Sequence, residues 1–443
     1  MTPIQIYPQG SACPTDPNFS KNHIQRPALL LPGDGYLYVA FSMMDGNSSP
    51  YPNGMIFAYN TVNLSATPLC LAMAPGGTQG NGAGIWQGGA GPAYAPDGLG
   101  KSYVFFNTAN GTFNLNTAGG SAGDSFVKLY NSGTALSIKD YFTPIDQRFR
   151  SDKTCGTGSG DVDFGSGGPM IIPYAENSGY DYLAVGGEKE GYLFFMNLQR
   201  PGEYGNSSTD GSCLGMGTNG NVQAFATNGT HVIHTNPAYW ETGTGTNYLY
   251  IGSQWDTLPD TSGELMQYQI CGTGTTPITS ANGCSNSVTY ATDGGVQVTF
   301  PNGTTPSVSA ASTSQSDAIV WAIWADGNVV PNTSTITYSV NNHNFTEYPS
   351  QNGRLYAFDA VSMTKLYSSE DCVVGGTNVD RINPATKFSI PTVANGHVYV
   401  GTMGARCQDP KTGLSGMDDS SGCYNSGTFY IFGKLSSQRT TCQ

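Results

Sequence analysis

Ionisable and aromatic side chains recur at one position of this sequence, shortly before proline-led apolar runs. They are Arg26 before Pro27, Trp86 and Gln87 before Pro92, Asp161 and Asp163 before Pro169, His231 and His234 before Pro237, and Lys387 before Pro391. Side chains of these types could bind a polar ligand. Of the set, Asp163, His234 and Lys387 are the candidates for proton transfer, because carboxylates, imidazoles and amines do that work in enzymes. Whether they act together depends on the elements that carry them.

Those elements form a phrase that occurs six times. Each copy has a proline-led run, a run rich in Tyr and β-branched residues, and a glycine-led run such as GMIFAYN (54–60) or GRLYAFD (353–359). Three or four strands recurring at intervals of tens of residues are typical of β-propeller blades. The copies span about 24–75, 84–146, 160–204, 222–300, 303–370 and 386–435.

The sequence therefore predicts an all-β fold, a single β-propeller domain over 1–443 with about six four-stranded blades and long loops. Seven or eight blades are the alternatives. Residues 3–8 are hypothesised to close the ring as a strand of the last blade. An additional hairpin is expected in VTYATDGGVQVTF (288–300), where two alternating runs flank an Asp-Gly-Gly turn.

If the blades are in phase, the candidate residues should line one mouth of a central channel, where propeller loops build binding sites. Structural roles are the alternative for each of them. Asp161 and Asp163 could cap a turn, and His231 and His234 could hydrogen-bond to neighbouring blades. Trp86 could pack between sheets, and Lys189 is expected at a solvated hairpin tip between two glutamates.

Composition excludes several classes of partner. The net charge is −13 with 18 Lys plus Arg and no basic stripe, so we expect no nucleic-acid binding and little attraction to anionic membranes. No apolar run is long enough to predict a membrane span. The 26 tyrosines offer amphipathic surface for contacts with carbohydrate or protein.

Ten scattered cysteines without a CxxC pair indicate disulfides formed in an oxidising compartment rather than a zinc site, and metal binding is left open. The expected pairs are Cys271–Cys284, Cys407–Cys423 and Cys155–Cys213, with Cys13, Cys70, Cys372 and Cys442 unassigned. An extracellular protein is therefore expected, although the opening MTPIQIYPQG does not have the pattern of a signal peptide.

Nine Asn-x-Ser/Thr sequences are candidate glycosylation sites, and all lie in predicted turns or at the edges of strands. They are Asn18, Asn47, Asn63, Asn110, Asn206, Asn228, Asn302, Asn332 and Asn344.

The segment GRLYAFDAVSMTKLY (353–367) resembles the repeat of quinoprotein dehydrogenase-like propellers, in which the phrase is similar to G-x-L-x-A-x-D-A. The phrases GIWQGGAGPA (84–93), DVDFGSGGPM (161–170) and KFSIPTVANGHVYVGT (387–402) look like an uncharacterised branch of that superfamily. The resemblance covers about 22–433. It implies a propeller fold and, as an alternative activity, oxidation of sugars or alcohols with pyrroloquinoline quinone (PQQ) and calcium.

The chemistry of that family needs features that this chain does not have in its sequence. In its alcohol dehydrogenases, adjacent cysteines form a disulfide lid over the quinone, and no Cys-Cys pair occurs here. Docking tryptophans are also missing from the repeats. The favoured hypothesis is a secreted, non-catalytic propeller that binds carbohydrate or protein or associates with itself. The alternative is a PQQ- and calcium-dependent dehydrogenase with its site at the channel mouth.

Overall fold

The computed structural model is almost entirely β-structure. It describes residues 13, 16, 19–43, 54–75, 82–96, 100–109, 111–117, 119–144, 147, 162–174, 181–199, 203–204, 221–227, 232–243, 245–254, 263–271, 276–280, 284–301, 303–313, 317–325, 336–340, 343–347, 353–374, 377–378, 380–382, 385, 388–402 and 428–433. The chain forms two compact units, the first with residues 1–237 and 270–286 and the second with residues 238–269 and 287–443.

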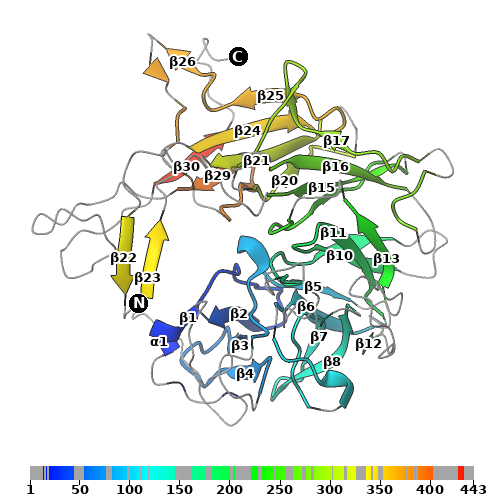
Figure 1. Cartoon of the computed structure of the whole chain (residues 1–443), viewed down its shortest axis with the longest axis vertical. Helices are drawn as coiled ribbons and strands as arrows, with labels where there is room; N and C mark the ends of the chain where they lie inside the picture. The colour runs from blue at the N-terminus through cyan, green and yellow to red at the C-terminus, as the bar shows by residue number, and fades with distance from the viewer. Residues whose placement is uncertain are drawn as a thin grey trace, which may run out of the picture. The chain divides into compact units, whose positions relative to one another are not determined.

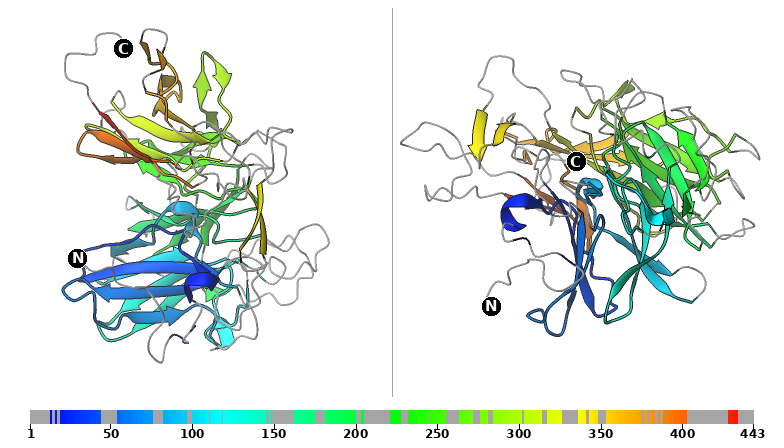
Figure 2. Two further views of the ribbon diagram at one scale, coloured as in Figure 1. Left: turned by 90° about the vertical axis from the view of Figure 1, so that its left-hand side faces the viewer. Right: turned by 60° about the horizontal axis from the view of Figure 1, so that its bottom comes forward.

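The first unit contains three antiparallel sheets that follow one another along the chain (Figures 1 and 2). The first sheet is preceded by α1 (Phe19–Asn22) and consists of β1 (His23–Ile24), β2 (Tyr36–Met43), β3 (Met55–Asn60) and β4 (Leu69–Ala72). The second consists of β5 (Ala93–Pro96), β6 (Ser102–Asn107), β7 (Phe126–Asn131) and β8 (Leu136–Thr143), with β12 (Glu203–Tyr204) added in parallel to β8. The third has the order β13 (Asn221–Ala226), β11 (Tyr192–Asn197), β10 (Tyr182–Gly187) and β9 (Met170–Pro173).

The second unit repeats this plan. Its first sheet comprises β14 (Ala238–Trp240), β15 (Asn247–Gly252), β16 (Leu265–Ile270) and β17 (Thr289–Tyr290). The next has β20 (Ser307–Ser309), β21 (Ile319–Ala325), β24 (Gly353–Asp359) and β25 (Lys365–Ser368), and the last has β28 (Thr392–Ala394), β29 (His397–Gly401) and β30 (Phe429–Gly433). Smaller pairs are β18 (Thr292–Asp293) with β19 (Val296–Gln297), β22 (Ile336–Val340) with β23 (His343–Glu347), and β26 (Val373–Val374) with β27 (Thr377–Asn378).

Consecutive up-and-down sheets of this kind are propeller blades, so the predicted all-β propeller fold is confirmed. The additional hairpin is also confirmed, as β18 and β19 pair around Gly294 and Gly295, both in the left-handed region. The copy boundaries differ at two points. Residues 203–204, predicted as the end of the third copy, pair with β8 of the second sheet. Residues 221–226 complete the third sheet instead of opening the fourth copy, because the strand pairs back onto β11 after a long loop. No helix in the described residues is long and apolar enough to cross a membrane.

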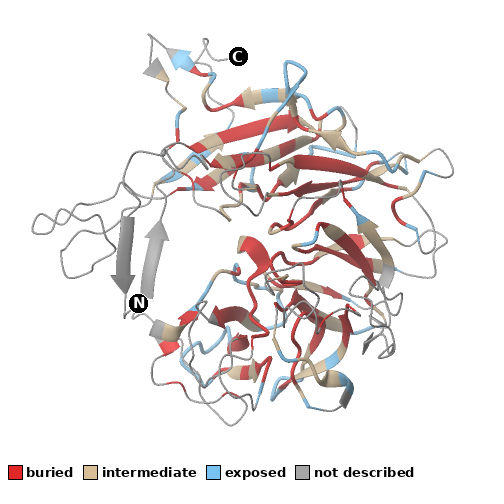
Figure 3. Cartoon of the chain, in the orientation of Figure 1, coloured by how far each residue is buried: buried red, intermediate tan, exposed pale blue. Residues whose placement is uncertain are grey.

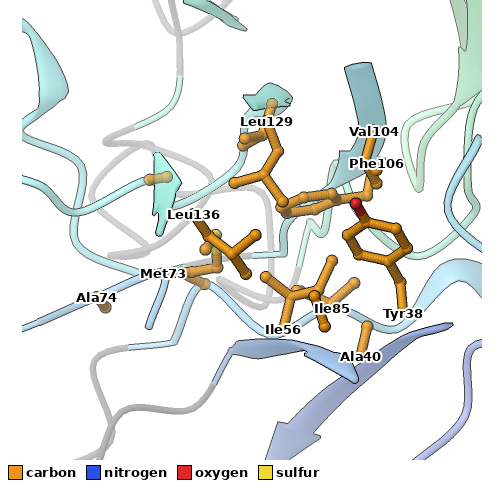
Figure 4. Close-up of a cluster of buried hydrophobic side chains, with 14 residues drawn as sticks. Tyr38, Ala40, Ile56, Met73, Ala74, Ile85, Val104, Phe106, Leu129 and Leu136 are labelled. Carbon is orange, nitrogen blue, oxygen red and sulfur yellow. The ribbon is translucent and has the colours of Figure 1, made fainter. Parts of the chain in front are cut away.

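The central strands are apolar on both faces, so each sheet must be covered on both sides. In β3 every residue from Met55 to Tyr59 is buried, and Figure 3 shows similar burial along middle strands of the other sheets, except in β29, where only Val398 and Val400 are buried. Neighbouring sheets within a unit provide the cover. Tyr38 and Ile56 of the first sheet pack against Val104, Phe106 and Leu129 of the second (Figure 4). Packing of sheet against sheet buries apolar area that dominates the stability of such a fold.

The second face of the first sheet is covered differently. Phe19 of α1 packs edge-on against Phe41 and Phe57, with ring centroids 5.0 and 5.8 Å apart. A disulfide joins Cys13 to Cys70 of β4 and holds this N-terminal segment against the sheet. The sequence left both of these cysteines unassigned. A segment of chain therefore covers the face of the first sheet that does not pack against the second sheet.

The other cysteine predictions have different outcomes. The Cys271–Cys284 disulfide is confirmed, and Cys372 is also disulfide-bonded. The expected pairs Cys155–Cys213 and Cys407–Cys423 lie outside the described residues, as do Cys442 and the proposed closing strand 3–8.

Polar side chains form hydrogen bonds between neighbouring sheets at equivalent positions in the two units. The Lys128 ammonium of β7 donates to the carbonyl oxygen of Leu198, just beyond β11, at 2.9 Å. In the second unit, the Gln267 amide and the Tyr250 hydroxyl donate to the carbonyl oxygen of Ala360, just beyond β24, and the Tyr250 contact is 2.6 Å long. Each of these hydrogen bonds provides a partner for a backbone carbonyl group at the end of a strand. Buried backbone carbonyl groups need such partners.

Burial of Tyr250 predicts a loss of stability in alkaline solution. Burial raises the pKa of this phenol above its ordinary value, against a smaller lowering by the Gln267 hydrogen bond. The native state keeps the proton when the unfolded chain loses it, so this contribution is full below about pH 10 and falls as the pH rises further. Tyr250→Phe should lower the free energy of unfolding by about 1 kcal/mol at neutral pH. Above pH ~10, the free energy of unfolding of this variant should decline less steeply than that of the wild type. Urea unfolding at several pH values measures both, and identical pH slopes for the two proteins would contradict the assignment.

Candidate functional site

Four segments of the first unit that carry candidate residues pack against one another backbone to backbone. The Ala28 amide donates to the carbonyl oxygen of Ala90 at 3.2 Å, and the Gln87 amide donates to that of Gly165, also at 3.2 Å. The hydroxyl of Ser166 lies 3.2 Å from the carbonyl oxygen of Ile233. Segments 26–28, 84–92, 163–168 and 232–237 thus adjoin in the order in which the repeat places them.

The turn at Gln87 has an unusual backbone. Gln87, Gly88 and Gly89 have φ values of 50, 51 and 90°, and they form the short 3-10 turn η1 (Gln87–Gly89). A glutamine in the left-handed region is uncommon, and such residues gather at functional sites. Gly88 is required here, because a Cβ would lie 2.0 Å from the carbonyl oxygen of His234.

The side chain of Gln87 is fully buried beside Asn107. Its Oε1 accepts a hydrogen bond from the Asn107 backbone amide at 3.2 Å, and the Asn107 side-chain amide donates to the Gly167 carbonyl, also at 3.2 Å. Within the part of the chain that the structure describes, Gln87 Nε2 and Asn107 Oδ1 have no hydrogen-bond partner. A buried donor and acceptor without protein partners are usually met by water or by a ligand.

Asp163 is bound to a lysine. Its Oδ2 lies 2.6 Å from Lys189 Nζ, and the two side chains are only 9 and 12% exposed. The prediction of a solvated Lys189 is therefore wrong. The preceding Glu188 explains the difference, because its carboxylate accepts the backbone amides of Glu190 and Tyr192 at 2.8 and 2.9 Å. Glu188 builds the turn, and Lys189 reaches inward to Asp163.

Arg26 and Trp86 form a second contact within the site. The guanidinium carbon of Arg26 lies 4.3 Å from the centroid of the Trp86 ring, which is within the range of a cation–π interaction. Trp86 is 7% exposed, so the ring supports Arg26 rather than offering a free stacking surface. Arg26 itself is partly exposed.

The last segment of the site is fixed by an asparagine that is not among the predicted site residues. Asn236 Oδ1 accepts a hydrogen bond from the Gly168 amide at 2.7 Å. His234 is partly exposed next to it in the chain. Asn236 directly precedes Pro237, as Gly168 precedes Pro169. Its position in the repeat, just before a proline-led run, could therefore have identified Asn236 as a site residue. Asn107 and Lys189 lie outside that position, and the repeat gave no signal for either.

The structure thus brings Arg26, Trp86, Gln87, Asp163 and His234 into adjoining segments of one unit. Asp161, His231 and Lys387 lie outside the described residues.

The described residues do not fit a PQQ site with calcium. Such a site needs carboxylate and amide oxygens that converge on the cation, and no group of three or more His, Cys, Asp or Glu side chains with that geometry occurs in the described ranges. The Asp163 carboxylate is already engaged by the ammonium of Lys189. We therefore derive no catalytic step through the quinone.

No known protein family matches the sequence, and no curated protein matches it. Solved structures are similar at low identity. Quinohemoprotein alcohol dehydrogenase from Comamonas testosteroni is 12% identical with a TM-score of 0.43, over 87% of this chain and 57% of that one. A europium-containing methanol dehydrogenase is 10% identical with a TM-score of 0.39, over 93 and 74% of the two chains. The α-L-arabinanase of Penicillium chrysogenum, complexed with arabinobiose, is 9% identical with a TM-score of 0.42, over 93 and 98%.

These neighbours include both oxidoreductases and glycoside hydrolases, and at such identities the similarity concerns the fold alone. The chain spans 57% of the length of the quinohemoprotein.

The Asp163–Lys189 pair gives a test of the site's architecture. Because both side chains are nearly buried, Asp163→Asn or Lys189→Met alone should leave one charge without its partner and lower the free energy of unfolding by about 3 kcal/mol. The double variant should lose clearly less free energy of unfolding than the sum of the losses in the two single variants. Denaturant unfolding of the four proteins measures the coupling, and strictly additive losses would show that the two charges do not depend on each other.

Proposed function

We propose that this chain is a secreted, non-catalytic β-propeller that binds carbohydrate at the site formed by segments 26–28, 84–92, 163–168 and 232–237. The fold itself does not select an activity, since propellers carry many functions. The proposal rests on what the side chains of this site are free to do.

The observation that carries the proposal is the ion pair between Asp163 and Lys189. A general base must be free to accept a proton from the substrate, and a calcium ligand must be free to turn toward the cation. A carboxylate held 2.6 Å from an ammonium, in a nearly buried setting, supports a structural role over these two. The same is true of Glu188, whose two oxygens are occupied by backbone amides.

Binding is supported by three other side chains of the site. Arg26 is positioned by Trp86 and keeps part of its surface exposed, so it can donate to a ligand oxygen with little loss of conformational freedom. Gln87 Nε2 and Asn107 Oδ1 supply a donor and an acceptor without protein partners. Both atoms are buried, so an ordered water, which both donates and accepts, matches that combination, and such a water would bridge to a sugar hydroxyl at the surface of the site.

Secretion is supported by two disulfides, Cys13–Cys70 and Cys271–Cys284, because such bonds persist in oxidising compartments. Of the candidate glycosylation sites, Asn63 lies in an exposed turn that follows β3, and Asn344 is the second residue of β23. An exposed turn can accept a glycan without disturbing the sheet.

A glycan array followed by calorimetry on the best ligand tests the binding proposal. Arg26→Met should weaken the affinity roughly tenfold or more, because it removes a charged donor from the site. Lys139→Met is the matched control. Lys139 also lies over an aromatic ring, 5.5 Å from the centroid of Tyr130, but away from this site. Absence of binding to every glycan, or equal affinity loss in both variants, would contradict the proposal.

The dehydrogenase alternative is tested separately. The protein is supplied with PQQ, calcium and an artificial electron acceptor, and common sugars and alcohols are screened for dye reduction. We expect no reduction above the rate without protein. Reduction that disappears in Asp163→Asn, in protein shown to be folded, would establish the enzyme and overturn the non-catalytic function.

A further inference from the structure

One short segment of the chain is closed by a disulfide at its ends and bound by a single side chain near its middle. It runs from Cys271, which directly follows β16, to Cys284, which precedes β17, and the two cysteines are bonded to each other. Residues 271–284 are called here the disulfide loop. Together with the third sheet, they belong to the first compact unit.

The disulfide loop contacts the edge strand of the third sheet through Gln223 of β13. The Ile278 amide donates to Gln223 Oε1 at 3.0 Å, and Gln223 Nε2 donates to the carbonyl oxygen of Ile278 at 2.9 Å. One side-chain amide therefore provides both hydrogen-bond partners for the backbone of one residue. Ile278 is 2% exposed, so its backbone groups need these partners. The pair of hydrogen bonds fixes residues 276–280 against β13.

The ends of the disulfide loop are held close together by pairing that does not involve the disulfide. In the β16–β17 pair, Met266 lies opposite Tyr290 and Gln267 lies opposite Thr289. Cys271 comes after these residues of β16 and Cys284 before those of β17. Reduction would therefore leave the two thiols near each other. A sequence separation of 13 also keeps the entropic cost of closing the loop small, so the disulfide can form again.

The Cys13–Cys70 disulfide is placed differently. Its cysteines are 1 and 5% exposed and pack in the apolar cluster that includes Phe57, whereas Cys271 and Cys284 are both partly exposed. A thiolate must reach a sulfur atom for thiol–disulfide exchange to occur, so access favours the opening of Cys271–Cys284. The sequence separation in the other pair is 57, and that disulfide anchors a terminal segment rather than closing a short loop.

We propose that the Cys271–Cys284 disulfide is a redox switch that controls whether residues 276–280 stay bound to β13. In the oxidised state the closed loop has few conformations, so the two hydrogen bonds between Gln223 and Ile278 form at little further entropic cost. A small dithiol opens the switch. It gives two electrons and two protons to the disulfide, which becomes two thiols, and is itself oxidised to a cyclic disulfide. The open loop has more conformations, and the two hydrogen bonds break more often.

Graded reduction of the native full chain with dithiothreitol, followed by alkylation and peptide mass spectrometry, tests the order of opening. Cys271 and Cys284 should become alkylated at a reductant concentration roughly tenfold or more below that needed for Cys13 and Cys70. Removal of the reductant before alkylation should restore the Cys271–Cys284 disulfide. Equal reductant requirements for the two pairs, or earlier opening of Cys13–Cys70, would overturn the proposal.

Hydrogen exchange tests what the disulfide holds. Selective reduction should accelerate exchange in 276–280 roughly tenfold or more, because the free energy of one to two hydrogen bonds is lost there, while β10 and β11 stay protected. Cys271→Ser/Cys284→Ser should exchange fast without reductant. Gln223→Leu should do so with the disulfide intact. The control Gln147→Leu removes a similar hydrogen bond, from Gln147 Nε2 to the Gly111 carbonyl oxygen at 2.8 Å, and should leave 276–280 protected.

Two results of the exchange experiment would contradict the switch. Protection of 276–280 that persists after reduction would show that the disulfide does not hold this segment. Loss of protection throughout the first unit would show that the disulfide holds the whole fold, not one segment. Carbohydrate binding at the candidate site does not depend on either result.

Discussion

The structure depends on one constraint: its sheets are apolar on both faces and cannot be stable alone. Burial of Met55 through Tyr59 along β3, residue after residue, is possible only if a layer lies on each side. The chain solves this by stacking sheet on sheet within each unit and by placing a disulfide-anchored segment over the second face of the first sheet.

The same stacking builds the candidate site. Sheets can approach closely only if the segments that lead into them have small side chains, and GIWQGGAGP and DFGSGGP supply glycines there. Their backbones then touch, and polar groups that point into the contact must find partners. Asn236, Ser166 and Asn107 meet this need with hydrogen bonds to neighbouring segments. Among the described residues, Gln87 Nε2 and Asn107 Oδ1 remain as buried polar atoms without a hydrogen-bond partner.

Much of the fold could be predicted from the sequence, because repeated alternation of apolar runs determines strands and their order. The phase of the repeat also placed Gln87, Asp163 and His234 on adjoining segments. It could not reveal that Lys189 turns inward, since that depends on Glu188 binding two amides of its own turn. The Cys13–Cys70 disulfide could not be predicted either, because the two cysteines have a sequence separation of 57 and only the fold brings them together. Pairing of β13 with the third sheet was missed because loop length does not specify a partner strand.

The central claim is that these segments pack backbone to backbone, and Gly88 tests it most directly. Alanine there would place a Cβ 2.0 Å from the carbonyl oxygen of His234, in addition to the strain of φ = 51°. At Gly33, φ is also positive, at 89°, but a Cβ would meet nothing within 4 Å. The free energy of unfolding should fall by about 1 kcal/mol in Gly33→Ala, from backbone strain alone, and by several times that in Gly88→Ala. Equal losses in the two variants would show that the segments do not touch, and the site as described would not exist.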